Sequence, residues 1–334
     1  MLTPFYPPNL GGAETFTEGL VKEAIKCHKV TVLTFQPFKQ KSEKFYSQPN
    51  LEIYRMNWLL KQSGAWKGVS LRNILSVIPQ LALKSFLLCL RNKYDIIHAQ
   101  GLLSGFVTVL LKKVFKTKAY MTLLALYKFS EWRGIKRAAT NFIFRNCDMI
   151  FVEGQNGMND LCGMDWVSIK PFYHWCDQSI FCPPSERPTD NFRVLFIGRP
   201  IPEKGKHIIE QVEKYLAFDK RFEFTYVENV PHSELPKLYQ NHHVVVVPSL
   251  YAEGFTRVVA EAACCGCAVI TSDKGSLPEM VEEFGLSIDP TVEKFVYWIK
   301  ATDTEMFGKK SFRFAKENFS PKNAEVFLNE YANN

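Results

Sequence analysis

The sequence has 334 residues, which is long enough for two domains of ordinary size. Hydrophobic residues make up 46% and charged residues 22%, with a mean hydropathy of −0.12, which excludes a disordered chain and a polytopic membrane protein. The net charge of +7 is unevenly divided, since residues 1–170 carry +12 and residues 171–334 carry −5. Such asymmetry indicates that one half faces an anionic partner: nucleic acid, a membrane surface or a phosphorylated substrate.

Short apolar runs alternate with amphipathic stretches, a pattern typical of βαβ units and parallel sheets. The strands predicted in the first half are Val30–Phe35, Leu51–Arg55, Asp95–Ala99, Ala119–Leu123 and Met149–Val152. Those predicted in the second half are Arg193–Ile197, Arg221–Val227, Val244–Pro248 and Ala268–Thr271. The predicted helices include Thr15–His28, Ile74–Arg91 and Phe255–Cys265.

Two features bear on the compartment. The apolar stretches Ile74–Leu90 and Leu102–Phe115 are interrupted by polar residues, so we expect buried or surface-lying helices rather than membrane spans of about 20 residues. Nine scattered cysteines do not form a disulfide framework, and a reducing cytoplasm suits them best. The one cluster, Cys264–Cys267, has no second pair at zinc spacing, so we expect it to pack in the core.

The strongest chemical signal lies between Val244 and Pro278, where a buried strand ends in a loop that opens a helix. Ligands of open α/β sheets bind beyond the carboxyl ends of the strands. Gly254 in this loop lets the backbone approach a ligand, and the first N–H groups of the helix suit a phosphate. Glu253 and Glu261, with seven residues between them, can accept hydrogen bonds from sugar or ribose hydroxyls. The alternative is that they are ordinary charges on a solvated helix.

Two further loops indicate a phosphate site. After the predicted strand 193–197, Gly198 permits a tight turn, and Arg199 and Lys204 can clamp a diphosphate. Two cations in a loop are usually solvated, but their place at the mouth of the same sheet as Glu253 favours binding. Near the start of the chain, Gly11 and Gly12 precede a helix and offer another phosphate or sugar contact, or only a turn.

In this order and spacing, the three segments resemble the GT4 family of glycosyltransferases with the GT-B fold, and the resemblance covers almost the whole chain. Further matching segments are Asp95–Gly101 with His98, Phe172–Phe181, Phe319-Ser320 and Tyr331. The resemblance implies an α/β fold of two Rossmann-like domains facing across a cleft. The expected parts are an acceptor-binding domain over 1–170, a linker over 171–190, a nucleotide-sugar-binding domain over 191–315, and a helix over 316–334 that crosses back to the first domain.

The resemblance also implies a reaction: retaining, metal-independent transfer of a hexose from a nucleotide-sugar to a glycan or lipid-linked acceptor, with no cofactor. The catalytic residues it implies are Glu253, His98, Arg199 and Lys204. The donor-binding residues it implies are Gly11, Gly12, Gly198, Arg199, Lys204, Glu253, Gly254, Phe255, Thr256 and Glu261. The chemistry is coherent, because a departing nucleoside diphosphate gains charge that fixed cations and backbone dipoles stabilise.

The sequence departs from the family pattern at Leu124. Family members often place a His just after the strand that matches Ala119–Leu123, near the reacting sugar carbon. His98 is one substitute for it, although a His at a strand end is as often a structural hydrogen-bonding residue. The predicted first strand, Met1–Thr3, is also short: either the sequence begins inside it, or the strand has only two or three residues.

The basic residues of the first half cluster beside apolar and aromatic segments that include Trp132. They are Lys112, Lys113, Lys116, Lys118, Arg133, Lys136, Arg137 and Arg145. The pattern favours an anionic membrane surface, and thus a peripheral enzyme on the cytoplasmic face, with a solvated helix face as the alternative. Since the sequence has no nucleic-acid motif, basic charge alone does not predict a nucleic-acid partner.

Two other classes of protein are weighed against a glycosyltransferase. A nucleotide-dependent oxidoreductase would need a GxGxxG sequence between a strand and a helix, and the sequence has none. A nucleotide-sugar-binding protein without turnover is compatible with Leu124 and with the short first strand. In either nucleotide-sugar interpretation, the residues expected to select the base lie near Val227–Ser233.

Overall fold

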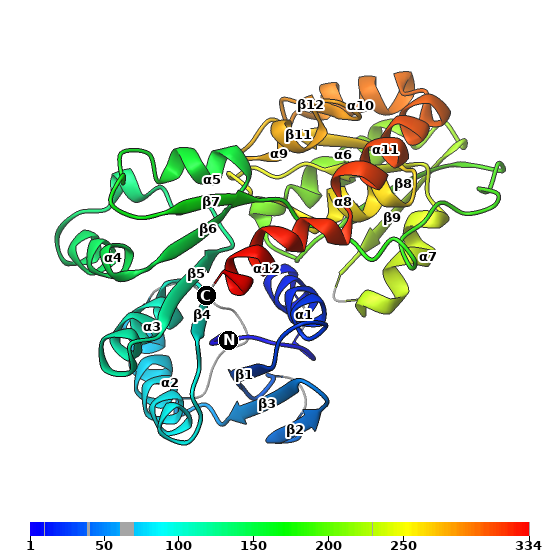
Figure 1. Ribbon diagram of the computed structural model, residues 1–334. Coiled ribbons are helices and arrows are strands. Elements are labelled where there is room, and N and C mark those ends of the chain that lie inside the picture. The colour runs from blue at the N-terminus through cyan, green and yellow to red at the C-terminus, as the bar shows by residue number, and fades with distance from the viewer. Residues whose placement is uncertain (10, 39–40, 61–69, 229, 334) are drawn as a thin grey trace. The chain divides into compact units, whose positions relative to one another are not determined.

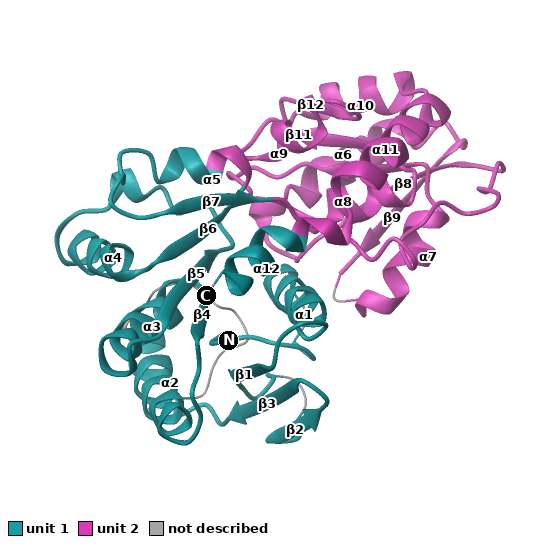
Figure 2. Ribbon diagram, viewed as in Figure 1, with its two compact units in different colours: residues 1–153, 157–172, 324–334 teal, residues 154–156, 173–323 magenta. Residues whose placement is uncertain are grey.

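The computed structural model describes residues 1–9, 11–38, 41–60, 70–228 and 230–333 (Figure 1). The chain forms two compact units, which Figure 2 colours separately. Unit 1 consists of Met1–Glu153, Gly157–Phe172 and Ala324–Asn334, and unit 2 of Gly154–Asn156 and Tyr173–Asn323.

The C-terminal segment that belongs to unit 1 begins at Ala324, later than residue 316, where the sequence predicts it. The physical reason is that Phe319 is buried in the core of unit 2 together with Ala315. The backbone of Cys176 also donates a hydrogen bond to the carbonyl of Phe319 (3.0 Å). These contacts keep the chain in unit 2 for eight residues more than expected.

Parallel strands form most of unit 1. They are β1 (Val30–Phe35), β2 (Phe45–Gln48), β3 (Leu51–Met56), β4 (Ile96–Gln100), β5 (Lys118–Leu123), β6 (Met149–Glu153) and β7 (Ile169–Phe172). The strand orders are β1-β3-β2 and β4-β5-β6-β7, and the β2–β3 pair alone among these is antiparallel.

The segment around Leu2 joins these two sets of strands. Leu2 forms a parallel bridge to Leu33 of β1 on one side and to Ala99 of β4 on the other. Its N–H donates to the carbonyl of His98, and its own carbonyl accepts from Gln100, both at 2.8 Å. The short first strand expected from the sequence is therefore reduced to one bridged residue, which still closes the gap between β1 and β4.

The helices of unit 1 are α1 (Gly12–Ala24), α2 (Leu71–Arg91), α3 (Leu102–Phe115), η1 (Phe129–Glu131), α4 (Gly134–Asn146), α5 (Gly154–Asp160, whose first turn belongs to unit 2) and α12 (Glu325–Ala332). α2 begins after Ser70, whose hydroxyl accepts a hydrogen bond from the N–H of Asn73 (3.2 Å). One face of α2 packs on the sheet, where Val77 and Leu81 share a core with Leu33 of β1.

The C-terminal helix α12 is anchored in unit 1 by an aromatic cluster. The ring centroid of Phe327, which is fully buried, lies 4.3 Å from that of Phe151 on β6 and 5.1 Å from that of Phe172 on β7. Phe16 of α1 completes the cluster, 5.9 Å from Phe327. Four segments distant in sequence are thus held together by apolar contact.

The described strands of unit 2 form one parallel sheet, and helices pack on both of its faces. Its strands are β8 (Phe192–Ile197), β9 (Phe222–Val227), β10 (Val244–Val247), β11 (Ala268–Ser272) and β12 (Leu286–Ile288), in the order β12-β11-β10-β8-β9. Its helices are η2 (Pro202–Lys204), α6 (Lys206–Leu216), η3 (His232–Glu234), α7 (Leu235–Gln240), α8 (Arg257–Cys264), α9 (Leu277–Val281), α10 (Val292–Ala301), α11 (Thr304–Asn318) and η4 (Pro321–Ala324), the last ending in unit 1.

Alternate residues of β10 enter two different cores. Val245 packs with α8 and α11, and Val244 packs with α6 and α10. A strand buried on both faces reads in the sequence as a continuous apolar run, as VVVV does here. The cysteine cluster Cys264–Cys267 lies in the first of these cores with its thiols buried and free, which confirms the predicted packing role.

Candidate active site

The loops that follow β8, β10 and β11 meet at one edge of the unit 2 sheet, because these strands are parallel neighbours. Backbone hydrogen bonds tie the loops to one another. The N–H of Leu250, after β10, donates to the carbonyl of Glu203, after β8 (2.8 Å). The N–H of Ser276, after β11, donates to the carbonyl of Glu253 (2.9 Å). The loop that carries Glu253 is therefore fixed on both sides.

Two glycines make this close approach of the loops sterically allowed. Gly205 has a φ of +72°, and a Cβ at this position would lie 2.0 Å from the carbonyl oxygen of Pro248. Gly275 has a φ of +63°, and a Cβ there would lie 2.2 Å from the carbonyl oxygen of Glu253. Both positions require the left-handed backbone and the missing side chain that only glycine provides. Gly205 thereby places Lys204 beside the end of β10.

Lys204 and Glu253 form an ion pair at this edge, with 2.5 Å between Nζ and Oε1. Ser249 donates a further hydrogen bond to the same Oε1, and the hydroxyl of Tyr251 donates to Oε2 (3.1 Å). Both side chains of the ion pair are largely buried. An ionised carboxylate has about four acceptor positions, so one position on Oε2 is left for a ligand hydroxyl.

Glu261, on α8, has a separate set of partners. Its Oε1 accepts hydrogen bonds from His232 Nε2 (2.9 Å) and Arg257 Nε (3.1 Å), and its Oε2 accepts from the hydroxyl of Tyr239 (3.0 Å). Burial alone would raise the pKa of Glu261, but the charge of Arg257 and the hydrogen bonds from His232 and Tyr239 lower it below its ordinary value. The carboxylate is thus kept ionised inside the protein.

The predicted cation Arg199 is placed differently from Lys204. It is exposed on the loop after β8, and its side chain forms no ion pair with either carboxylate among the described residues. The preceding Gly198 donates its N–H to the carbonyl of Val227 on β9 (3.1 Å), which fixes the start of the loop. Of the two predicted cations, the structure therefore brings only Lys204 into contact with Glu253.

The residues after Glu253 form the start of α8. The helix begins at Arg257, two residues later than expected, because Thr256 has an extended backbone with φ −86° and ψ 127°. The N–H of Thr256 points at the thioether sulfur of Met280 (3.3 Å), which is a weak acceptor. Phe255 is buried against the ring of His174, 5.7 Å away and nearly parallel, while Gly254 is half-buried.

The predicted catalytic residue His98 has structural partners here, and its catalytic role stays a prediction. The residue is buried in the core of unit 1, where Nδ1 contacts the hydroxyl of Tyr331 (2.5 Å) and Nε2 contacts the hydroxyl of Thr122 (2.7 Å). Burial lowers the pKa of His98 to about 3, so the ring is neutral. Both ring nitrogens are engaged in the core, which matches the structural alternative given above.

The remaining predicted positions in unit 1 are exposed or half-buried. Gly11 is the residue before α1, and Gly12 is the first residue of that helix; both are exposed. Leu124 follows β5 and is half-buried, so an apolar side chain occupies the place where the resemblance leads one to expect a His. The donor-binding roles of Gly11 and Gly12 stay predictions.

Some residues that complete the site were not predicted. Ser249 and Tyr251 lie four and two residues before Glu253, and their hydroxyls are the signal that sequence reasoning missed. His232 and Tyr239 reach Glu261 from η3 and α7, and spacing along the chain does not indicate that contact. His232 lies in the expected base-selecting stretch Val227–Ser233, of which Asn229 is outside the described residues.

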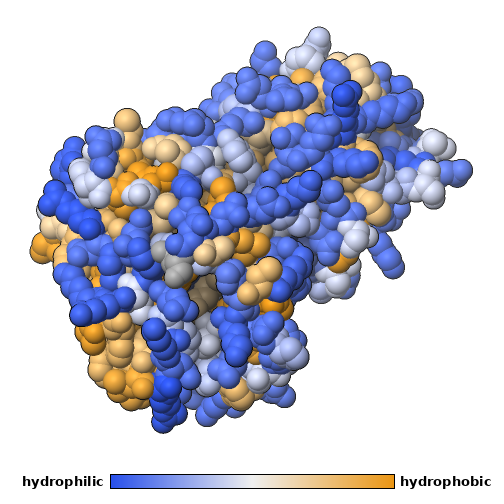
Figure 3. Space-filling model, viewed as in Figure 1, coloured by the Kyte–Doolittle hydropathy of each residue, from blue (hydrophilic) through white to orange (hydrophobic). Residues whose placement is uncertain are grey.

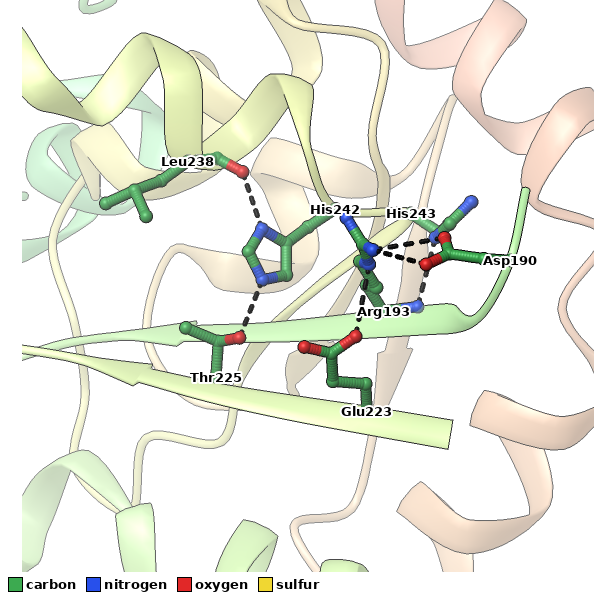
Figure 4. A network of polar contacts seen from close by, with 7 residues as sticks. All are labelled: Asp190, Arg193, Glu223, Thr225, Leu238, His242 and His243. Carbon is green, nitrogen blue, oxygen red and sulfur yellow. Dashed lines mark hydrogen bonds and ion pairs between the residues drawn. The ribbon is translucent and has the colours of Figure 1, made fainter. Parts of the chain in front are cut away.

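A second polar network lies at the opposite end of the same strands (Figure 4). Arg193, at the start of β8, pairs with Asp190 (2.8 Å) and with Glu223 (3.1 Å). His242 bridges the carbonyl of Leu238 (2.6 Å) and the hydroxyl of Thr225 (2.8 Å). These groups satisfy one another at the amino ends of the strands, so we interpret the network as structural. Within the described ranges, no group of three or more His, Cys, Asp or Glu could hold a metal ion.

Comparison with known proteins finds a family model that matches part of the C-terminal half. Residues 185–301 match the family model described as glycosyl transferases group 1. Over 65 residues the chain is 45% identical to O-antigen chain mannosyltransferase B of Escherichia coli, a match that covers 20% of this chain and 17% of that protein. Over 319 residues it is 23% identical to a phosphatidylinositol N-acetylglucosaminyltransferase subunit from Arabidopsis thaliana, covering 85% of this chain and 69% of that protein.

Solved structures give the fold. The chain superposes on sucrose-phosphate synthase from Thermosynechococcus elongatus with a TM-score of 0.80 and 19% identity, over 99% of this chain and 98% of that one. A trehalose-6-phosphate protein from Escherichia coli bound with UDP-2-fluoro glucose superposes with a TM-score of 0.77 and 11% identity, over 98% of each chain. The predicted GT-B fold of two Rossmann-like α/β units is confirmed.

The class that these findings define is that of proteins with the GT-B fold and a match to the group 1 glycosyl transferase model. The resemblance drawn from the sequence is confirmed, since residues 185–301 match the group 1 glycosyl transferase model. The matched range includes the Lys204–Glu253 pair and Glu261.

Proposed function

We propose that the protein is a retaining, metal-independent glycosyltransferase that moves a hexose from a nucleotide-sugar to a glycan or lipid-linked acceptor at the cytoplasmic face of a membrane. The observation that carries the proposal is the buried ion pair of Lys204 and Glu253, on loops locked together at the carboxyl edge of the unit 2 sheet. A buried charge pair is costly to keep, and this one lies where sheets of this class bind ligands.

In the proposed complex, Lys204 and Arg199 bind the diphosphate, and the backbone N–H groups of Gly254 and Phe255 donate to the same charge. The free position on Glu253 Oε2 accepts a hydroxyl of the donor sugar, and the free position on Glu261 Oε2 accepts a ribose hydroxyl. As the glycosidic bond to the diphosphate breaks, negative charge grows on the leaving group. Cations already in place stabilise that charge more than they stabilise the ground state.

Retention and metal independence are parts of the same proposal. Both oxygens of Glu253 already accept hydrogen bonds, which makes this carboxylate a poor nucleophile. Attack by the acceptor on the face that the diphosphate leaves suits such a site, because no covalent sugar–enzyme bond is then needed. Lys204 and Arg199 supply positive charge of the kind that a divalent cation provides elsewhere.

The donor and acceptor classes rest on different observations. The E. coli structural neighbour was solved with UDP-2-fluoro glucose, which supports a nucleotide-sugar donor. The named relatives are a mannosyltransferase of an O-antigen chain and a transferase named for phosphatidylinositol, which supports a glycan or lipid-linked acceptor. The +12 charge of residues 1–170 supports an acceptor or membrane surface that is anionic.

Release of nucleoside diphosphate from a nucleotide-sugar tests the proposal, in the presence and absence of a chelator. The wild type should turn the donor over equally with and without EDTA, and Glu253→Ala should lose about a hundredfold or more in rate. Glu305→Ala is the matched control, because that carboxylate is exposed on α11. If the wild type and Glu253→Ala bound donor equally and neither turned it over, the protein would be a nucleotide-sugar-binding protein without turnover.

A further inference from the structure

The exposed face of α2 is apolar, whereas the exposed face of a surface helix in a globular protein is typically polar. Its exposed apolar residues recur at helical spacing: Leu75, Leu83, Phe86, Leu87 and Leu90. Leu83 is 64% exposed and Leu90 62%. We call these five residues the α2 face. Figure 3 shows apolar surface gathered over α2 and α3 at the lower left.

The neighbouring helix α3 extends the apolar surface. The ring of Phe86 lies 5.3 Å from that of Phe115 at the end of α3, so the two helices touch at this point. Leu110 and Val114, one turn apart on α3, are also exposed. A patch of this kind on one side of a domain marks an interaction surface.

The opposite face of α2 is fixed in unit 1. By length and composition alone, Arg72–Arg91 could cross a membrane. Val77, Leu81 and Leu88 are buried in the core with β1 and β4, however, and crossing would strip them from it. The helix is therefore suited to lie along a membrane surface with its exposed leucines in the lipid.

The charge around the α2 face suits an anionic surface. Between Glu52 and Glu131 the sequence has one acidic residue, Asp95, against twelve Lys and Arg. The exposed cations on and beside α2 and α3 are Arg72, Arg91, Lys93, Lys113 and Lys116. Leucines flanked by cations match the apolar interior and the anionic headgroups of a bilayer.

A second copy of the chain is a poorer occupant of this surface. A two-fold dimer places the same patch on both sides of the interface. The cations beside α2 would then face their own copies across the contact, with almost no acidic residue to neutralise them. An anionic bilayer satisfies both the leucines and the cations.

We propose that the α2 face inserts into the headgroup region of an anionic phospholipid bilayer and holds unit 1 on it. The inference deepens the proposed function and rests on its placement of the enzyme at a membrane, but it assigns insertion to the leucines of α2 and shares only Lys113 and Lys116 with the basic cluster near Trp132. In that cluster Lys136 lies over the ring of Trp132 (3.5 Å), and Lys112 pairs with Asp148 (2.9 Å). These two cations already have partners within unit 1, whereas the leucines of α2 are exposed.

Vesicle flotation of the full chain tests the proposal, using phosphatidylcholine with and without phosphatidylglycerol. The wild type should float with the phosphatidylglycerol vesicles and only weakly with phosphatidylcholine alone. The double substitution Leu83→Glu, Leu90→Glu should lower the bound fraction about tenfold or more, because it puts two charges into lipid. Both side chains are exposed, and an unchanged Tm would show that the variant folds.

The control must match the change in charge. Tyr215→Glu with Phe218→Glu also replaces two exposed apolar residues, 69% and 99% exposed, but in unit 2, and should float like the wild type. Glu253→Ala should float normally as well, so that loss of turnover and loss of membrane binding remain separate results. Equal flotation of the Leu83/Leu90 variant and the wild type would overturn the proposal. A wild-type dimer in light scattering that only this variant dissociates, with no wild-type flotation, would assign the face to a second copy.

Discussion

At the scale of single residues, Gly205 does more for the site than its size suggests. It lets the loop after β8 turn in the left-handed conformation and touch the carbonyl of Pro248, and so brings Lys204 to Glu253. Without it, the carboxylate and the cation would not meet. The site therefore depends on a residue that has no chemistry of its own.

Gly205→Ala should destabilise the protein by about 3 kcal/mol and abolish donor binding. The new Cβ would lie 2.0 Å from the carbonyl oxygen of Pro248, and alanine is strained at the positive φ of this position. Urea unfolding and donor-induced thermal shift measure the two effects. Gly266→Ala is the control, since its φ is +68° but its nearest contact would be an ordinary 3.5 Å. Equal losses of stability in the two variants would show that the contact with Pro248 does not matter.

The buried imidazole of His98 should make unit 1 sensitive to acid. Its pKa is about 3 in the folded protein, because of burial and then the positive amino terminus, against an ordinary 6.5. Below about pH 6.5 the unfolded chain takes up a proton that the folded chain refuses, so stability falls by up to about 1.4 kcal/mol per pH unit until about pH 3.

Urea unfolding of the wild type and His98→Gln between about pH 5 and pH 7 measures this slope. The variant should be less stable at neutral pH, because it loses the contacts with Tyr331 and Thr122. Its stability should nevertheless vary less with pH than that of the wild type. Parallel curves for the two proteins would mean that His98 does not carry the pH dependence.

Residue roles were predictable where they follow from local spacing. Glu253, Lys204 and Gly198 follow strands that the sequence shows as apolar runs. In the structure these residues lie at one edge of the sheet. The partners of Glu261 come from other elements and could not be read from spacing. The buried position of His98 could not be predicted, because a strand-end histidine looks the same in the sequence whether it faces a ligand or a core.

At the scale of elements, buried parallel strands were predictable and exposed or very short ones were not. The nine strands expected from the sequence are present with ends shifted by at most one residue, because each forms a continuous apolar run or an alternation of apolar and polar residues. β2 was missed because all four of its residues are exposed. β12 has only three residues, too few to form a pattern.

The docking of α12 is an element-scale contact that can be measured. Phe327→Ala should lower the free energy of unfolding by about 3–5 kcal/mol, since it leaves a cavity among Phe16, Phe151 and Phe172. Phe218→Ala, at a position that is almost fully exposed, should change it little. Similar unfolding free energies for the two variants would contradict the proposed anchoring of the C-terminus in unit 1.

At the scale of the whole molecule, the reactivity of the cysteine thiols shows which parts of the chain are buried in the folded protein. All nine are free, and only Cys27 and Cys162 are exposed. A thiol reagent should therefore label these two quickly, while burial raises the pKa of Cys267 to about 11 and protects it. Mass spectrometry after brief labelling checks this. Rapid labelling of Cys264, Cys265 or Cys267 in the folded protein would contradict their place in the core of unit 2.

The division into two α/β units was predictable, because the alternation of strands and helices is interrupted by a proline-rich segment after Lys170. The path of the chain between the two units was not predictable. Residues Gly154–Asn156 join unit 2 because Glu279 accepts hydrogen bonds from the backbone of Gln155 (2.8 Å) and Asn156 (3.4 Å). Nothing in the local sequence signals a contact with a residue more than a hundred positions away.

The central claim is that the Lys204–Glu253 edge of unit 2 binds a nucleoside-diphosphate sugar, and thermal shift with UDP-, GDP-, ADP- and dTDP-sugars tests it most directly. One donor at about a hundred times its Kd should stabilise the wild type by about 2.7 kcal/mol and raise its Tm by several degrees. Lys204→Ala should lose that shift, while Lys309→Ala, at an exposed cation on α11, should keep it. A shift of the same size in Lys204→Ala, or no shift of the wild type with any of the four donors, would contradict the claim.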